Sequence, residues 1–169
     1  MDTNDKRVVR PIQETTLSGA LTGKGGYDHF MLKEIFEQPQ VIGDTLHSFV
    51  NPSDKTITLP ELPIDLAAAS KITITACGTA YYAGLTAKYW LEQIARVSVE
   101  VDIASEFRYR STVLPDDGLT ILISQSGETA DTLAALQYCR EHGQKILSIV
   151  NVPESTIARE SDAVLKTYA

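Results

Sequence analysis

From residue 65 onward, apolar runs alternate with segments that are apolar on one side only. The runs at 119–124 and 146–150 are almost continuously apolar, as strands buried on both faces are. Amphipathic spacing predicts helices over 80–95 and 128–142. The predicted strands lie at 71–77, 97–102, 119–124, 146–150 and 162–168. Strands that alternate with helices indicate an α/β fold, here a three-layer αβα domain with a doubly wound parallel sheet.

The residues before this region follow a different pattern. Residues 1–27 are polar and end in a glycine-rich stretch, so we expect a tail or linker there. Residues 28–64 are interpreted as an N-terminal helical segment and connection. Apolar residues recur at helical spacing on both sides of Pro39, which we expect to start a second helix, and 55–64 is predicted to be irregular. The α/β domain then covers residues 65–169.

Composition and charge limit the possible partners. The chain has 169 residues and a net charge of -7. This charge argues against binding to nucleic acid or to an anionic membrane, since binding to either needs a basic face. No run reaches the roughly 18 apolar residues of a membrane span, and the first five residues are acidic and polar, unlike a secretory signal. The cysteines suit a reducing compartment, and Cys139 with His142 cannot complete a metal site. We therefore expect a cytoplasmic protein with no metal and no cofactor.

The junction between the strand at 119–124 and its following helix is unusually rich in hydroxyl groups. It reads Ser124-Gln125-Ser126-Gly127-Glu128-Thr129. Ligands of parallel α/β sheets lie beyond the carboxyl ends of the strands, where the first N–H groups of a helix lack partners and the helix dipole is positive. Glycine allows the backbone to approach an anion, and three hydroxyls can donate hydrogen bonds. This pattern indicates a site for a phosphate monoester.

Helix capping is the alternative role for Ser126 or Thr129, since hydroxyl residues commonly cap helices. One cap needs only one hydroxyl, so three hydroxyls exceed that requirement. Glu128 is expected to point outward, because its carboxylate would repel a phosphate. The stretch lacks the Gly-Lys-Ser/Thr ending of a Walker A loop and is not a Gly-x-Gly-x-x-Gly motif.

A second junction, residues 76–80 after the first predicted strand, has the same design. Thr79 is placed either to reach the same ligand or to cap the following helix, and both roles stay open. Cys77 is interpreted as a buried structural cysteine rather than a nucleophile, since no neighbouring base is visible. Asn151 follows another predicted strand at the same end of the sheet, where it lines the pocket or serves a turn.

These junctions resemble the sugar isomerase (SIS) domain, which binds phosphosugars. The sequence is more closely similar to the family of glutamine–fructose-6-phosphate aminotransferase (isomerising), also called glucosamine-6-phosphate synthase. The resemblance covers about residues 25–169 and rests on five stretches in the same order: "HFMLKEIFEQP" (29–39), "ACGTAYYAG" (76–84), "ASEFRYR" (104–110), "SQSGETADTLAAL" (124–136) and "NVPESTIARESD" (151–162). It implies that the chain corresponds to the linker and most of the first SIS domain of a longer enzyme, with 65–169 incomplete at its C-terminus.

The resemblance also implies the site residues. By motif position, the phosphosugar contacts are Ser124, Gln125, Ser126 and Thr129. Thr79 lies beside the sugar, and Ala80 stands where the family often has a sugar-contacting serine, so one contact is lost here.

Intact enzymes of this family take ammonia from glutamine and convert fructose 6-phosphate to glucosamine 6-phosphate. The resemblance therefore implies a phosphosugar ligand (fructose 6-phosphate, glucose 6-phosphate or glucosamine 6-phosphate). It also implies an amidotransferase domain and a second SIS domain as partners, and a homodimeric intact enzyme. The family's catalytic residues lie in those other domains, and we expect no lysine here to follow the carboxyl end of a strand. The chain is therefore expected to bind a phosphosugar without catalysing a reaction.

Two other interpretations stay open. A regulatory SIS module that senses a phosphosugar would carry a helix-turn-helix domain, whereas residues 28–50 supply about two helices and no basic face. A flavodoxin-like phospho-acceptor domain would need an acidic cluster at the strand ends, where this sequence has hydroxyl groups.

Overall fold

The computed structural model describes residues 23–168, which divide into two compact units between Gln38 and Pro39. In the first unit, the rings of Tyr27 and Phe36 stack with their centroids 5.8 Å apart. Helix α1 (Phe30–Phe49) is a single helix of 20 residues with Pro39 inside it, so the prediction of a second helix was wrong. Proline removes one helical hydrogen bond and crowds the preceding turn, but the helix can continue on either side.

A small hairpin follows α1. Its strands β1 (Val50–Asn51) and β2 (Thr56–Ile57) pair antiparallel. Within the turn, the side chains of Asn51 and Asp54 each accept a backbone N–H at 3.0 Å. The prediction of an irregular connection over 55–64 is therefore wrong for β2, because strands of two residues are too short to leave a periodic pattern.

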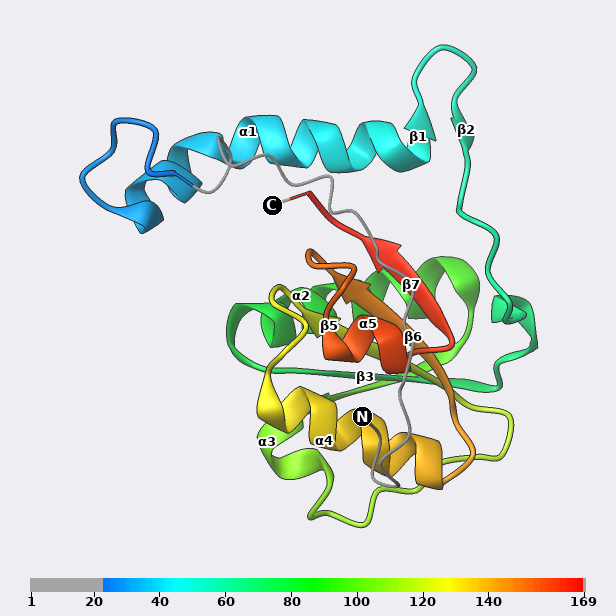
Figure 1. Cartoon of the computed structure of the whole chain (residues 1–169). Coiled ribbons are helices and arrows are strands. Elements are labelled where there is room, and N and C mark those ends of the chain that lie inside the picture. The colour runs from blue at the N-terminus through cyan, green and yellow to red at the C-terminus, as the bar shows by residue number, and fades with distance from the viewer. Residues whose placement is uncertain (1–22, 169) are drawn as a thin grey trace, which may run out of the picture. The chain divides into compact units, whose positions relative to one another are not determined.

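The second unit contains a parallel five-stranded sheet with the order β4-β3-β5-β6-β7 (Figure 1). Its strands are β3 (Lys71–Ala76), β4 (Ser98–Ile103), β5 (Leu119–Ser124), β6 (Lys145–Val150) and β7 (Ala163–Lys166). Each of them overlaps the strand predicted for it, and β5 has the predicted bounds at both ends. The predicted doubly wound α/β fold is therefore confirmed.

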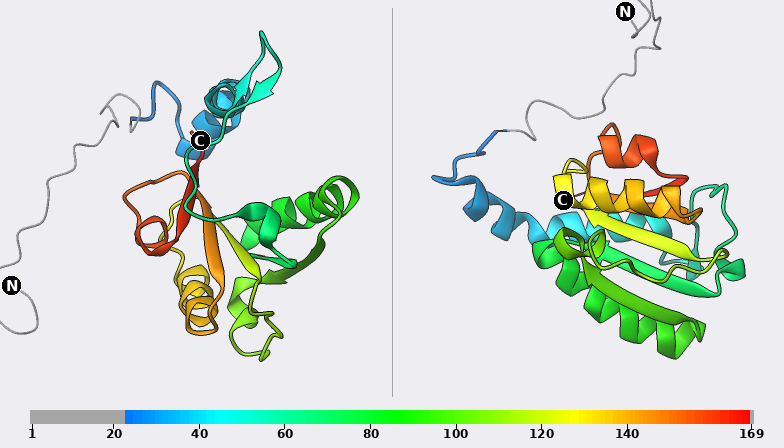
Figure 2. Two further views of the ribbon diagram at one scale, coloured as in Figure 1. Left: turned by 90° about the vertical axis from the view of Figure 1, so that its right-hand side faces the viewer. Right: turned by 90° about the horizontal axis from the view of Figure 1, so that it is seen from below.

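Helices connect the strands and cover both faces of the sheet. They are α2 (Gly78–Trp90) with its π-helical extension η2 (Leu91–Ala95), α3 (Ala104–Phe107), α4 (Ala130–Glu141) and α5 (Thr156–Glu160), and a 3-10 turn, η1 (Leu66–Ala68), precedes β3. The connection β3–α2–β4 moves to one side of β3, whereas β5–α4–β6 moves to the other, so the winding reverses between β3 and β5. Right-handed crossovers then place α2 and α4 on opposite faces, as Figure 2 shows.

Each face of the sheet has its own apolar core. Phe107, Leu122 and Leu136 are fully buried between the sheet and the layer of α3, α4 and α5. Ile74 and Val99 are buried on the face that α2 covers. Burial of such a side chain contributes about 1.5–3 kcal/mol. The two cores therefore hold the carboxyl ends of β3 and β5 in fixed positions.

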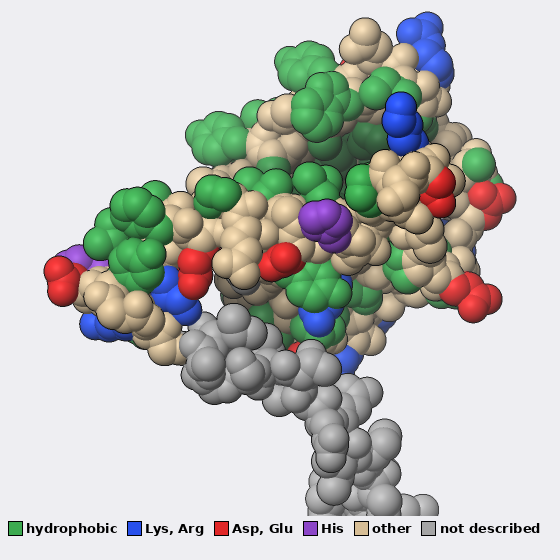
Figure 3. All heavy atoms as spheres, turned by 90° about the horizontal axis from the view of Figure 1, so that it is seen from above, with side chains coloured by type: hydrophobic (Ala, Val, Ile, Leu, Met, Phe, Trp, Pro, Cys, Tyr) green, Lys and Arg blue, Asp and Glu red, His purple; other side chains and the backbone are tan. Residues whose placement is uncertain are grey.

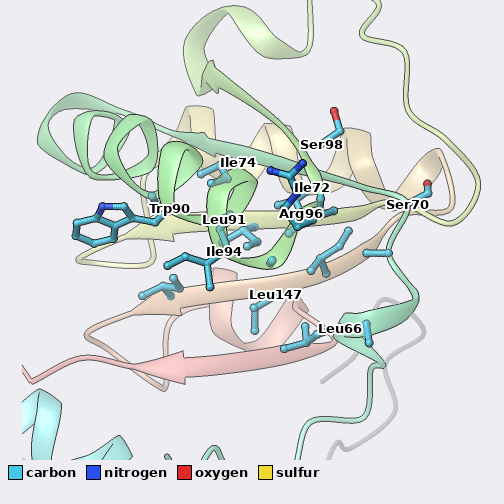
Figure 4. Close-up of a pocket in the computed structure, with 18 of the residues that line it drawn as sticks. Leu66, Ser70, Ile72, Ile74, Trp90, Leu91, Ile94, Arg96, Ser98 and Leu147 are labelled. Atoms are coloured by element: carbon cyan, nitrogen blue, oxygen red, sulfur yellow. The ribbon is translucent and has the colours of Figure 1, made fainter.

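An open apolar groove of about 840 Å³ lies on the α2 face (Figure 4). Strand residues such as Ile72 and Leu147 line it, with Trp90 and Ile94 from α2 and η2. Arg96 is the single charged residue among the described residues that line it. Because the lining is almost entirely aliphatic, this groove does not suit an anionic ligand.

Large hydrophobic side chains also remain exposed along α1. Met31, Ile35 and Phe36 are 68%, 57% and 64% exposed, and Figure 3 shows hydrophobic side chains at the surface of the molecule. No helix among residues 23–168 is long and apolar enough to cross a bilayer.

Candidate functional site

The reversal of winding brings two strand-to-helix junctions to one edge of the sheet. β3 and β5 are hydrogen-bonded neighbours, and Ala76 pairs with Ile123 at their carboxyl ends. Residues 77–79 therefore continue from one strand, and residues 124–129, the hydroxyl loop, continue from the adjacent strand (Figure 1). Such a reversal point is where open α/β sheets bind their ligands.

Ser124 organises the hydroxyl loop from its buried side. The residue is 4% exposed, its Oγ accepts the N–H of Gly127 at 3.1 Å, and the same oxygen lies 3.1 Å from Thr129 Oγ1. The exposed Ser126 also accepts a backbone N–H, that of Glu128 at 3.2 Å. Because Ser126 Oγ acts as the acceptor in that bond, its own proton stays available for a ligand.

The structure does not show the capping role considered for the hydroxyl groups. Thr129 is the N-cap residue of α4, but its side chain makes no capping hydrogen bond and is directed to Ser124 instead. Helix α4 is 12 residues long. Its first-turn N–H groups have no side-chain cap, so these groups and the helix dipole are available to an anion.

Gly127 has a conformation and surroundings that exclude other residues. Its φ of 65° lies in the left-handed region, which glycine adopts without strain. A Cβ atom at this position would lie 1.9 Å from Ser155 Oγ and 2.4 Å from Ser155 Cβ. The Gly127 carbonyl accepts the N–H of Ile157 at 3.0 Å. Gly127 therefore lets the hydroxyl loop pack directly against the start of α5.

The carboxylate of Glu128 is hydrogen-bonded to the start of α5. Its Oε1 accepts the N–H of Thr156 at 2.7 Å. Hydrogen bonds from Thr156, together with the nearby positive charge of Arg159, lower the pKa of Glu128. The Glu128 side chain is exposed, and its carboxylate is directed to the start of α5.

The second junction presents Thr79 at the start of α2. The helix begins at Gly78, which has a φ of 57°, and Cys77 holds the N-cap position without a side-chain capping bond. Thr79 is exposed in the first turn, so the capping role considered for it is not observed. Ala80 is half-buried and offers only a methyl group.

Neither cysteine has the features of an activated nucleophile. Cys77 is half-buried, whereas it was predicted to be buried. It directly follows the carboxyl end of β3, where the chain leaves the sheet. Cys139 is fully buried on the inner face of α4, and burial raises the pKa of its thiol to about 11. At neutral pH that thiol stays protonated and unreactive.

One lysine lies in the last strand of the sheet. Lys166 is the last residue of β7 and pairs with Val150 at the carboxyl edge of the sheet. Lys166 is part of the strand and does not follow it, but β7 ends here, whereas the predicted strand continued to residue 168. The Lys166 ammonium lies 4.8 Å from the ring centroid of Tyr168. Strand β6 separates β7 from the strand that carries the hydroxyl loop.

Sequence reasoning placed Asn151 at this end of the sheet but did not predict how residues 151–157, the supporting segment, contact the hydroxyl loop. The N–H of Asn151 donates to the carbonyl of Gln125 at 3.1 Å, so Asn151 holds the backbone of the hydroxyl loop. The only sequence signal for this contact is that β6 follows β5 and pairs with it, which brings the two following loops side by side.

Comparisons with a family model, with curated relatives and with solved structures all identify the same kind of domain. The sequence model of the SIS domain matches residues 65–169. The chain is 52% identical over 168 residues to a glutamine–fructose-6-phosphate aminotransferase [isomerizing] from Zymomonas mobilis, and 54% identical to one from Brucella abortus. Both alignments cover 99% of this chain, which spans only 28% of the length of each relative.

A solved structure shares the fold. It is described as the C-terminal domain of glucosamine-fructose-6-phosphate aminotransferase from Francisella tularensis, with a TM-score of 0.78 and 44% sequence identity. The match covers 86% of this chain and 41% of that chain.

Proposed function

We propose, since this chain belongs to the SIS domain family, that its hydroxyl loop binds the phosphate group of a phosphosugar. The observation that carries the proposal is the cluster of three hydroxyls and Gly127 at the N-terminus of α4, where the side chain of the N-cap residue Thr129 is not used for capping. Because this cluster lies where the winding of the sheet reverses, it occupies the position at which such folds bind ligands.

The proposed binding mode uses groups from both junctions. The phosphate accepts hydrogen bonds from Ser126, from the amide of Gln125 and from the first-turn N–H groups of α4. The Ser124 and Thr129 hydroxyls lie 3.1 Å apart and share one hydrogen bond, so the pair offers one further donor. Thr79, in the first turn of α2, lies beside the sugar. Hydrogen bonds to a charged group each contribute about 1.5–3 kcal/mol, so several of them can offset the cost of ordering a small ligand.

The wider proposal is that the chain is the phosphosugar-binding part of the isomerase region of a glutamine–fructose-6-phosphate aminotransferase. The relatives at 52% and 54% identity that carry this name support it. In this role the ligand is fructose 6-phosphate, glucose 6-phosphate or glucosamine 6-phosphate. The partners are an amidotransferase domain and a second SIS domain within a homodimeric, cytoplasmic enzyme.

The chain alone is proposed to bind without catalysing. Isomerisation needs a base placed over the reacting carbons of the sugar, but the Glu128 carboxylate accepts the N–H of Thr156. Release of ammonia from glutamine needs an activated nucleophile, and the Cys139 thiol is buried and protonated. A phosphate site that binds the ground state and the transition state equally does not accelerate the reaction.

Calorimetry on the 169-residue chain tests the binding proposal. Fructose 6-phosphate and glucose 6-phosphate are expected to bind more tightly than fructose and glucose. The double variant Ser126→Ala, Thr129→Ala is expected to weaken binding of the phosphosugars by about 3–6 kcal/mol, since it removes two hydrogen bonds to a charged group. Binding of the unphosphorylated sugars should not change.

Thr86→Ala is the matched control. It removes an exposed hydroxyl of α2 that bonds to the carbonyl of Tyr82 at 3.2 Å, away from both junctions, and phosphosugar affinity should stay at the wild-type value. Equal affinity of the folded wild-type chain for phosphorylated and unphosphorylated sugars would contradict the proposed function.

A further inference from the structure

The supporting segment holds the hydroxyl loop at three successive points. The N–H groups of Asn151 and Ile157 donate to the carbonyls of Gln125 and Gly127, at 3.1 Å and 3.0 Å. The N–H of Thr156 donates to Glu128 Oε1 at 2.7 Å. The first two contacts use only backbone atoms, whereas the third depends on one side chain.

Ser155 fills the remaining space between the supporting segment and the hydroxyl loop. It is 2% exposed and occupies the space that a side chain at position 127 would need. Its Oγ also accepts the N–H of Ala158 at 3.4 Å, so the start of α5 is itself fixed. The hydroxyl loop therefore rests on an ordered surface, and Glu128 contributes the side-chain contact with the N-terminus of α5.

The orientation of the hydroxyl groups depends on the same peptide units. The N–H of Gly127 donates to Ser124 Oγ, and the N–H of Glu128 donates to Ser126 Oγ. These bonds leave the Ser126 proton free to point outward. A shift of the peptide units at 127 and 128 would turn both serine hydroxyls at once.

We propose that Glu128 is a positioning residue for phosphosugar binding, which acts through its bond to the Thr156 N–H and does not touch the ligand. This inference rests on the proposed function of the hydroxyl loop. For removal of the Glu128 side chain, it predicts the opposite change in phosphosugar affinity from that expected of charge repulsion alone. A carboxylate in the same loop as a phosphate repels it, so removal of the charge alone would strengthen binding. Loss of the positioning bond weakens it.

Two substitutions of Glu128 separate the effect of its charge from the effect of its hydrogen bond to Thr156. Glu128→Gln removes the charge but keeps an oxygen that accepts the Thr156 N–H, so phosphosugar affinity is expected to equal or exceed that of the wild type. Glu128→Ala removes both, and affinity is expected to fall by roughly three- to tenfold, in line with coupling between residues of one hydrogen-bond network.

Glu160→Ala is the matched control for Glu128→Ala. It also removes one carboxylate that links α4 to α5, since Glu160 Oε2 lies 3.5 Å from Arg140 at the far ends of these helices. Its phosphosugar affinity is expected to stay within about twofold of the wild type, because distant sites act independently.

The experiment is a calorimetric titration of the four proteins with fructose 6-phosphate, together with amide hydrogen exchange without ligand. The expected structural signature is faster exchange of the backbone amides at positions 127 and 128 in Glu128→Ala, but not in Glu128→Gln. Wild-type affinity in Glu128→Ala, or an equal loss in Glu128→Gln, overturns the positioning role while the proposed function stands. Absence of binding to the wild-type chain overturns the proposed function itself, and the positioning role with it.

Discussion

Substitution of Gly127 by alanine tests the packing of the hydroxyl loop most severely. The residue has a φ of 65°, and a Cβ atom added to it would lie 1.9 Å from Ser155 Oγ. Two separate penalties follow. One is the strain of a left-handed backbone in a residue with a side chain, and the other is steric overlap with Ser155.

The structure allows the two penalties to be estimated separately. Left-handed backbone costs an alanine about 1–2 kcal/mol, and an extra methyl group in a packed region costs about 1–3 kcal/mol. Gly127→Ala is therefore expected to lower the free energy of unfolding by about 2–5 kcal/mol. Gly143 has a φ of 73° but nothing within 4 Å of an added Cβ, so Gly143→Ala should lose only about 1–2 kcal/mol.

Urea unfolding followed by circular dichroism measures both variants. Gly43→Ala completes the set, because Gly43 lies in helix α1 with open space around it, and alanine there should add about 0.5–1 kcal/mol. Ser155→Gly combined with Gly127→Ala should recover the steric part of the loss. Equal losses for Gly127→Ala and Gly143→Ala would refute the close packing between the hydroxyl loop and α5.

Three further predictions concern ionisation and catalysis. Burial raises the pKa of Cys139 from 9.0 to about 11. The thiol therefore contributes stability that is present below pH 9 and lost as pH rises to 11, at up to roughly 1.4 kcal/mol per pH unit, and Cys139→Ala should remove this part of the alkaline decline in a denaturation series. The hydrogen bond from Lys71 lowers the pKa of Glu100, which contributes stability that is lost as pH falls below about 4.5. Glu100→Gln should therefore flatten the acid end of the same series, and an unchanged acid slope would contradict this. Incubation of the chain with fructose 6-phosphate and either glutamine or ammonia should give no glucosamine 6-phosphate above a buffer control, and measurable product would contradict the proposed absence of catalysis.

The sheet could be predicted from local pattern because each strand is a short apolar run between turn residues. β5 matches the prediction at both ends, since its apolar residues stop where the hydroxyl loop begins. Helix starts were less accurate. α2 begins at Gly78 rather than at residue 80, because its N-cap is Cys77, which makes no side-chain cap that a sequence could signal. The general rule is that burial leaves a pattern in sequence, whereas uncapped helix ends leave none.

The two errors before residue 65 have separate physical causes. Pro39 costs helix α1 one hydrogen bond, and sequence alone does not show whether the helix ends or tolerates the loss. The hairpin strands β1 and β2 have two residues each, which is too short for any period to be seen. Their turn is held by Asn51 and Asp54, whose side chains each accept a backbone N–H, as such residues commonly do in turns.

The candidate site was accessible to sequence reasoning only in part. A cluster of hydroxyls at a strand-to-helix junction can be recognised because parallel sheets place such junctions at one edge. The contact between Glu128 and Thr156 spans 28 residues, and no sequence period relates the two positions. Whether the Thr129 side chain caps α4 also depended on coordinates, since the direction of one hydroxyl decides it.

The central claim is that the hydroxyl loop is where a phosphosugar binds. An NMR titration of the isotope-labelled chain with fructose 6-phosphate tests it most directly, with fructose as the comparison. The amide signals of Ser126 and Gly127 and those of the first turn of α4 should shift and saturate with fructose 6-phosphate, and should not respond to fructose. Saturable shifts confined to the apolar groove around Ile72 and Leu147, or no shifts with the phosphosugar, would contradict the account.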